Sequence, residues 1–271
     1  MQVEEVRLAY FSPTQTTKKV VQAVARGAGG RPIDDDLTLP EAKTRAIAPV
    51  DEGLAVLGAP VYGGRIPQDA ALRLRRLQGN QTPAVVVVVY GNREYDDALL
   101  ELCDLAVERG FRPVAAGAFI GEHSFHRDET PIAGGRPDGA DLALAERLGA
   151  QTGSMLAAAG AVEDLSLVQV PGNHPYRDGG KPLGLAPETI AEQCGACGSC
   201  VEVCPTAAIT VDEVAQTEAG LCIMCCACVR ACPRDARAVR AERVLQGAAR
   251  LSTTCAEPKQ PVVFGVPTAA G

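Results

Sequence analysis

Short apolar runs alternate with longer mixed stretches through the first 170 residues of the chain. Runs rich in β-branched residues, typical of strands, are found at 3–10, 33–39, 54–59, 84–90 and 114–120. Helices are expected from the loop at 12–17 to about Gly27, after Pro67, at 96–109 and at 138–159. This alternation of strand and helix predicts a parallel sheet that is covered by helices on both faces.

Successive strand and helix units of this kind predict an α/β, flavodoxin-like doubly wound parallel sheet with strand order 2-1-3-4-5. The stretch 84–90 is almost pure valine, as expected for a central strand buried on both faces. Asp138 is expected to cap the helix that follows it. In such sheets ligands bind beyond the carboxyl ends of the strands, so the loops after strands one, three and four are candidates for a site.

A polar stretch rich in Pro and Gly, residues 171–182, interrupts this pattern and is expected to separate two domains. We therefore expect a flavodoxin-like domain at 1–170, a linker at 171–187 and a small α+β domain at 188–245, where a repeated Cys-x2-Cys-x2-Cys-x3-Cys-Pro pattern is typical of a ferredoxin domain. Residues 246–271, rich in small residues, are expected to form a mobile C-terminal tail.

Composition narrows the classes of function. The chain has 271 residues, 46% of them hydrophobic, which is enough for a sizeable core. Its longest apolar run, 84–89, is too short for a membrane span, and a net charge of −7 argues against a nucleic-acid partner. The first residues lack the basic stretch and apolar core of a secretory signal, so we expect a cytoplasmic protein whose thiols stay reduced.

The pattern Cys-x2-Cys-x2-Cys-x3-Cys-Pro occurs twice, at 194–205 and 222–233. This spacing is typical of bacterial proteins with two [4Fe–4S] clusters, in which the fourth cysteine of each copy ligates the other cluster. One cluster would be held by Cys194, Cys197, Cys200 and Cys232. The other would be held by Cys222, Cys225, Cys228 and Cys204.

Zinc or a disulfide framework explains these cysteines less well. A zinc site needs four ligands and leaves the third cysteine and the proline of each copy unexplained. Cys103, Cys226 and Cys255 fall outside the pattern and are interpreted as spare thiols. The duplication continues past the cysteines, since Cys-Pro-Thr-Ala-Ala-Ile at 204–209 is echoed by Cys-Pro-Arg-Asp-Ala-Arg at 232–237.

The loop Ser-Pro-Thr-Gln-Thr-Thr at 12–17 lies where a helix N-terminus offers unpaired backbone N–H groups. Hydroxyls and a helix dipole at such a place can hold a phosphate. The turn has no glycine-rich dinucleotide or nucleoside-triphosphate motif, so the monoester phosphate of a flavin fits best. A run of Ser and Thr that only caps the helix is the alternative.

The loops at 58–67 and 90–95 combine tyrosines with glycines, which let the backbone approach a flat ring closely. Tyr62 and Tyr95 are the candidates to stack on an isoalloxazine ring, although either could lie at a loop rim instead. The other candidates in these loops are Pro60, Val61, Gly63, Gly64, Gly91, Asn92 and Arg93. His123 is a possible flavin neighbour without a catalytic role, and no catalytic residue is assigned.

The phrases FSPTQTT, GAPVYGGRIP, YGNREYDDAL and GEHSF, followed by the doubled cysteine motif, resemble the flavodoxin–ferredoxin fusion proteins known as EFR-type ferrodoxins. The resemblance extends to about Val244 and implies noncovalently bound FMN and two [4Fe–4S] clusters. It also implies a phosphate site and a ring site. The phosphate site would comprise Ser12, Thr14, Gln15, Thr16 and Thr17, and the ring site Pro60, Tyr62, Gly63, Asn92 and Tyr95. Gln15 stands where such loops often carry glycine.

These features together predict an electron-transfer iron–sulfur flavoprotein that relays electrons between two [4Fe–4S] clusters and FMN, with a redox partner protein. Clusters exchange single electrons, whereas a flavin can accumulate a pair. Two alternatives stay open. One is a flavin-dependent reductase of a small acceptor, such as a quinone or a disulfide. The other is a redox sensor or complex subunit without catalysis. The sequence identifies neither the partner nor the oligomeric state.

Overall fold

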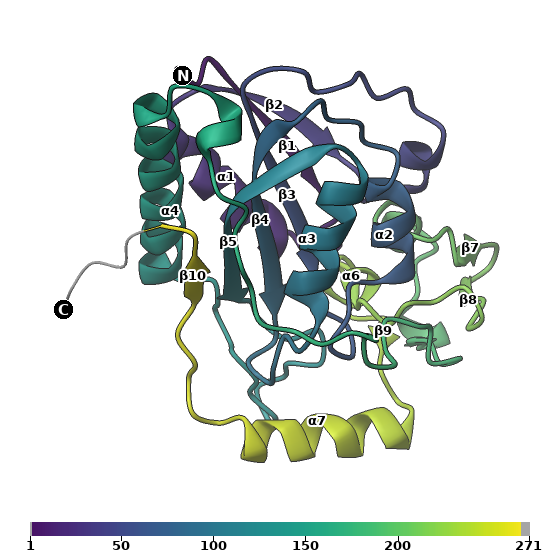
Figure 1. Cartoon of the computed structure of the whole chain (residues 1–271). Helices are drawn as coiled ribbons and strands as arrows, with labels where there is room; N and C mark the ends of the chain where they lie inside the picture. Colours follow the sequence, from purple (N-terminus) through teal and green to yellow (C-terminus); the bar gives the residue numbers. More distant parts are fainter. Residues whose placement is uncertain (1, 267–271) are drawn as a thin grey trace.

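The computed structural model of the chain describes residues 2–266. Its centre is a six-stranded sheet of order β10-β5-β4-β3-β1-β2 (Figure 1). The strands are β1 (Glu5–Tyr10), β2 (Arg31–Asp36), β3 (Leu54–Pro60), β4 (Thr82–Tyr90), β5 (Phe111–Ile120) and β10 (Val262–Phe264). Strands β1 to β5 are parallel in the order 2-1-3-4-5, which confirms the predicted flavodoxin-like fold.

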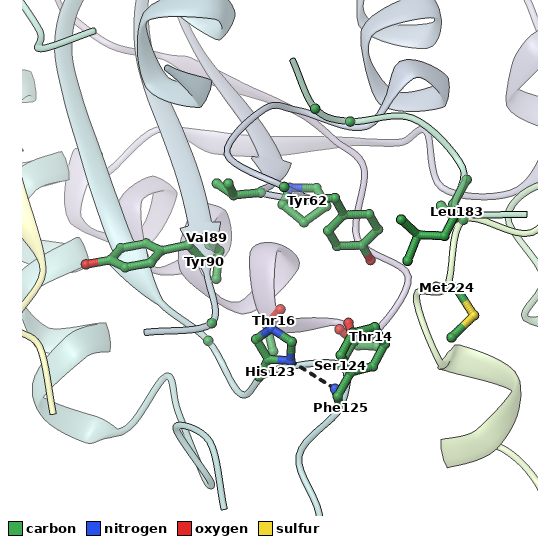
Figure 2. Close-up of a pocket in the computed structure, with 18 of the residues that line it drawn as sticks. Thr14, Thr16, Tyr62, Val89, Tyr90, His123, Ser124, Phe125, Leu183 and Met224 are labelled. Carbon is green, nitrogen blue, oxygen red and sulfur yellow. Dashed lines mark hydrogen bonds between the residues drawn. The ribbon is translucent and has the colours of Figure 1, made fainter. Parts of the chain in front are cut away.

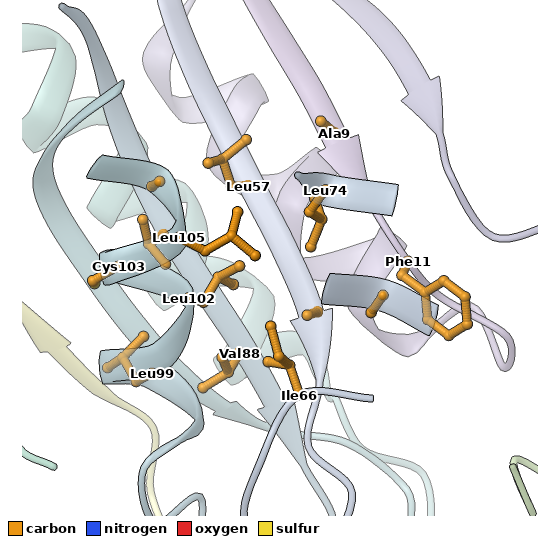
Figure 3. Packing of buried hydrophobic residues seen from close by; sticks show 14 of the residues in the cluster. Ala9, Phe11, Leu57, Ile66, Leu74, Val88, Leu99, Leu102, Cys103 and Leu105 are labelled. Atoms are coloured by element: carbon orange, nitrogen blue, oxygen red, sulfur yellow. The ribbon is translucent and has the colours of Figure 1, made fainter. Parts of the chain in front are cut away.

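Helices cover both faces of this sheet. The helices are α1 (Thr16–Ala28), α2 (Gln68–Leu74), α3 (Ala98–Glu108) and α4 (Gly139–Ala158), and α1 and α4 share one face. All nine residues of β4 are buried, and they alternate between the core under α2 and α3, shown in Figure 3, and the core under α1 and α4. The predicted central strand and the predicted cap are confirmed, since Asp138 accepts hydrogen bonds from the backbone N–H groups of Ala140 and Asp141.

The cysteine-rich part is built from short elements that lie beside the carboxyl ends of the strands. They are β6 (Glu188–Thr189), α5 (Ser199–Glu202), β7 (Ile209–Val211), β8 (Ala215–Thr217), α6 (Ala227–Arg230) and β9 (Arg237–Ala238). Strand β6 pairs with β9 and β7 with β8, both antiparallel. Three short 3-10 helices complete the chain, namely η1 (Pro40–Lys43), η2 (Val162–Asp164) and η3 (Ala191–Gln193). None of the helices within residues 2–266 is long and apolar enough to cross a membrane.

Arg73 of α2 joins the cysteine-rich part to the sheet. Its side chain is 1% exposed, and one guanidinium nitrogen donates to the backbone oxygens of residues 37–39, with 2.8 Å to Leu37 O and 3.0 Å to Leu39 O. The other guanidinium nitrogen donates to Pro205 O, next to Cys204. A buried cation that loses its acceptors is costly, so this bridge resists separation of the two parts.

The expectation of a mobile C-terminal tail is wrong for residues 246–266, while residues 267–271 lie outside the described residues. Residues Glu242–Thr254 form α7, and β10 then adds to the sheet antiparallel to β5 (Figure 1). Helix α7 buries Val244 and Ala248. This segment, despite its many small residues, therefore forms an amphipathic helix. The backbone of β10 pairs with the otherwise open edge of β5.

The segment at 171–187 contains no helix or strand, as expected for a linker, but it is held firmly. The backbone N–H groups of Asn173 and Arg177 donate to the Asp97 carboxylate at 2.9 and 2.7 Å. These hydrogen bonds, and the one from Arg177 most of all, lower the pKa of the Asp97 carboxyl group. The N–H of Gly180 donates to Tyr62 O at 3.0 Å. The linker is thereby fixed across the end of the sheet where the predicted site lies.

Helices α1 and α4 approach each other through glycine, and this contact yields a stability prediction. A Cβ atom on Gly149 would lie 1.9 Å from Val24 O, whereas one on Gly247 in α7 would meet no atom within 4 Å. We expect Gly149→Ala to lower the free energy of unfolding by roughly 1–3 kcal/mol through overpacking. Gly247→Ala should leave it unchanged or raise it by up to about 1 kcal/mol, because alanine favours a helix. Urea unfolding measures both, and equal stability of the two variants would contradict the close packing.

Candidate functional site

A cavity of about 460 Å³ lies beyond the carboxyl ends of the sheet strands, within the roughly 300–1,000 Å³ typical of ligand sites. It lies at the switch point where the strand order reverses, as doubly wound sheets favour. Its walls are formed by Thr14, Thr16 and residues 60–63, 89–91, 121–125, 178–183 and 223–224. Sequence-predicted residues from the loops after β1, β3 and β4 are thus brought together.

The loop before α1 offers hydroxyls to one end of the cavity. Thr14 and Thr16 line it, whereas Ser12 caps the helix, since its Oγ accepts from the N–H of Lys18 at 3.0 Å. The Oγ1 of Thr17 is buried and has no hydrogen-bond partner among the described residues. Gln15 has a φ of 64°, in the left-handed region, which accounts for the glycine often found at this place. A helix N-terminus with an unsatisfied hydroxyl fits a phosphate group.

The loops after β3 and β4 form the wall where a ring would lie. Tyr62 points into the cavity near Leu183 and Met224, while the side chain of Tyr90 points away from them (Figure 2). Burial, with the sulfur atoms of Cys225 and Cys226 nearby, raises the pKa of Tyr62. Pro60, Val61 and Gly63 also line the cavity. An aromatic side chain beside close-approaching backbone fits a flat ring.

Seven predicted residues do not line the cavity. Three of them, Ser12, Gln15 and Thr17, belong to the loop and first turn of α1, and packing explains the other four. The amide nitrogen of Asn92 donates to the backbone oxygens of Cys255 and Glu257, which holds the chain after α7. Arg93 pairs with Asp96. The ring of Tyr95 packs on Tyr90 at a centroid distance of 5.5 Å. Gly64 lies one residue beyond the lining segment, and its carbonyl accepts the N–H of Asp97.

His123 lines the cavity as a neutral imidazole. Its Nδ1 accepts from the N–H of Phe125 at 3.0 Å, and burial lowers its pKa to about 4. Gly91 makes this packing possible, since a Cβ atom there would lie 2.3 Å from the imidazole ring. His126 instead accepts the N–H of Ile132 and does not line the cavity. His123 therefore lies in the cavity wall, and its place next to a flavin stays a prediction.

Two walls of the cavity were missed by sequence reasoning. Residues 178–183 belong to the linker, and 223–224 lie between two cysteines of the second copy. The sequence of the linker indicated only a flexible connection. Its attachment to Asp97 could not be predicted, because it depends on contacts between residues far apart in the chain. Ile223 and Met224 carry only apolar side chains, which give no chemical signal of a site.

The eight patterned cysteines surround two small cavities, divided as the crossed ligand pattern predicts. Cys194, Cys197, Cys200 and Cys232 line the outer cavity. Cys204, Cys222, Cys225 and Cys228 line the inner cavity. Backbone N–H groups donate to the Sγ atoms of Cys204, Cys222 and Cys232 at 3.2–3.4 Å, as is common around iron–sulfur clusters. The residues present therefore fit a cluster in each cavity.

The other cysteine chemistries fit less well. All eleven cysteines are free thiols, and no three metal-ligating side chains within residues 2–266 converge closely enough to hold a single ion. Thiols spread around a cavity suit a multinuclear cluster better than one zinc ion. Cys103 is buried in the core under α3, and Cys226 is buried beside the inner cavity.

The inner cavity lies next to the larger one. Ile223 and Met224 line the large cavity and are flanked in the chain by Cys222 and Cys225, which line the inner cavity. The cysteines of the inner set are all buried, whereas Cys197 of the outer set is exposed. The three cavities thus run from the carboxyl end of the sheet toward the surface.

A family model described as a 4Fe-4S binding domain matches residues 187–210, which contain the first cysteine copy. This match supports iron–sulfur chemistry in the C-terminal part of the chain. No curated protein matches the chain.

Solved structures with similar folds include a flavodoxin from the domain Archaea, with 15% identity, 56% coverage of this chain, 99% of that chain and a TM-score of 0.35. A WrbA-like flavodoxin from Agrobacterium tumefaciens has 16% identity, 57% and 98% coverage and a TM-score of 0.36. Rubredoxin oxygen:oxidoreductase from Desulfovibrio gigas has 16% identity, 58% and 38% coverage and a TM-score of 0.39. The chain thus spans about two fifths of that oxidoreductase. The strand order, rather than these scores, assigns the flavodoxin-like fold.

Proposed function

We propose that this protein is an electron-transfer flavoprotein of the EFR type, carrying FMN in the large cavity and one [4Fe–4S] cluster in each cysteine-lined cavity. One observation carries the proposal. Ile223 and Met224 form a wall of the large cavity and belong to the chain segment that supplies inner-set cysteines. A flavin and a cluster held there would be close neighbours, as electron transfer between them requires.

The chain's own groups have distinct roles in this proposal. Thr14, Thr16 and Thr17, with the N-terminus of α1, hold the flavin phosphate. Tyr62 and the backbone of 60–63 and 89–91 enclose the ring and exclude water, and the linker residues 178–183 cover it. The flavin supplies the ability to accept one or two electrons. His123 stays neutral and borders the ring.

The arrangement also suggests the order of the relay. A partner protein docks at the outer set, where Cys197 is exposed, and is oxidised by one electron. Clusters held by the outer and inner cysteine sets would lie between this docking place and the large cavity, and would supply one-electron steps to or from a flavin bound there. The buried inner set is shielded from solvent, which protects the middle step from side reactions.

Composition of the anaerobically purified protein tests the proposal. We expect about eight irons per chain, with matching sulfide, and about one FMN, with a visible spectrum that bleaches on addition of dithionite. Iron and sulfide analysis and flavin extraction measure these values. Clusters without FMN, even after FMN is added, would contradict the relay.

The ligand assignment of the inner cluster is tested by adjacent cysteines. Cys225→Ala should lower the iron content by about four atoms per chain, because it removes a ligand of one cube. Cys226→Ala should retain all the iron, since Cys226 falls outside the repeated cysteine spacing and its Sγ donates to Met224 O. Iron analysis of both variants, purified without oxygen, measures the difference. A full iron content in Cys225→Ala would overturn the assignment.

The phosphate site is tested by replacing hydroxyls with methyl groups. Replacing Thr16 and Thr17 by Val should weaken FMN binding by roughly tenfold or more, as expected when hydrogen bonds to a charged group are lost. The iron content should not change. Thr152→Val is the control, because this buried hydroxyl donates to Leu148 O and Thr152 does not line the cavity. Flavin titration by fluorescence measures the affinities, and unchanged binding in the double variant would assign the phosphate elsewhere.

A further inference from the structure

Arg237, the first residue of β9, lies buried between the two sets of cysteines. Its side chain is 3% exposed and lines the outer cavity. One of its guanidinium nitrogens, Nη2, lies 4.0 Å from the Sγ of Cys228, which belongs to the inner set. One cation is therefore next to the ligands of both proposed clusters.

The Arg237 guanidinium donates hydrogen bonds to uncharged oxygen atoms. Nη1 donates to Thr189 Oγ1, and Nη2 donates to Thr217 Oγ1 and, at 2.9 Å, to Pro187 O. The remaining group, Nε, is buried without a hydrogen-bond partner. Across residues 2–266, the ion pairs with Asp or Glu include none made by Arg237. A buried charge without a counter-ion is costly, and the hydroxyl and carbonyl partners of Arg237 carry no negative charge to offset it.

The internal duplication shows that the fold itself does not require a cation here. Arg237 follows Cys232 by the same interval as Ile209 follows Cys204. Ile209 is 4% exposed and packs in the core of the cysteine-rich part. An apolar side chain thus fills the matching position in the first copy, where no buried charge has to be neutralised.

We propose that Arg237 is a shared counter-charge of the two clusters that stabilises their reduced states. The inference rests on the proposed function, which supplies the clusters. A cube with four thiolates is anionic, and each one-electron reduction adds negative charge, so a nearby cation raises the reduction potential. The Nε–H group of Arg237, which is buried without a hydrogen-bond partner, is a further donor available to cluster sulfur.

The field of Arg237 reaches cysteines of both sets. Arg237 lines the outer cavity together with its four cysteines, and its Nη2 is 4.0 Å from Cys228 Sγ of the inner set. Arg234 also lines the outer cavity, but unlike Arg237 it is exposed, beside Gly195. Solvent and salt screen such a charge strongly, which makes Arg234 a matched control three residues away.

The experiment is a mediated redox titration, followed by electron paramagnetic resonance, of the full holoprotein without oxygen. Arg237→Ile copies the first repeat, Arg237→Gln retains hydrogen bonding without charge, and Arg237→Lys retains the charge. In the Ile and Gln variants, we expect the equilibrium constant for one-electron reduction of each cluster to fall at least tenfold. A tenfold fall corresponds to a reduction potential that is 59 mV lower. Arg237→Lys and the control Arg234→Gln should stay close to the unchanged protein.

Iron content, measured on every sample, separates the possible failures. If the Ile and Gln variants do not assemble clusters but Arg237→Lys does, the need for a positive charge is supported. If all three Arg237 variants fail to assemble clusters, or if all three retain iron with unchanged reduction potentials, the inference about Arg237 is overturned. The proposed electron relay would not be affected by either result. An unchanged protein that binds no clusters would instead overturn the proposed function, and the inference with it.

Discussion

The buried bridge made by Arg73 is the interaction on which the arrangement of the site depends. It ties backbone oxygens after β2 to Pro205, beside a cysteine of the inner set. Because the guanidinium is enclosed, its acceptors cannot be exchanged readily for water. The cysteine-rich part is thereby kept against the carboxyl end of the sheet, and the walls contributed by Ile223 and Met224 stay in place.

This fixed attachment favours a relay that works without domain movement. The large cavity has walls from the sheet loops, the linker and the cysteine-rich part, so a bound flavin would stabilise the contact among all three. A carrier whose domains swing apart would instead expose its cavity at each turnover. The carboxylate of Asp97, which holds the linker through backbone N–H groups, adds to the same rigidity.

Sequence patterns predicted those features that depend on local spacing. The valines of β4 and the cysteine intervals specify a central strand and two ligand sets with little help from distant residues. Features that depend on tertiary packing were either not predicted from the sequence or predicted wrongly. Helix α7 contains many small residues and is recognised as a helix only when its apolar side packs on the rest of the protein. Asn92 and Tyr95 do not line the cavity because the chain after α7 and Tyr90 offer them partners. The burial of Arg237 likewise could not be predicted from the sequence, which shows only that an arginine stands where the first repeat has Ile209.

The antiparallel strand β10 brings the chain back to the sheet after the cysteine-rich part is complete. That part is therefore an insertion anchored at both ends, by the linker before it and by α7 and β10 after it. If it unfolds when its metal is lost, it cannot drift away from the sheet. Its cysteines stay at a high effective concentration beside their docking surface, so repair of a damaged cluster begins from a chain already held close to its final place.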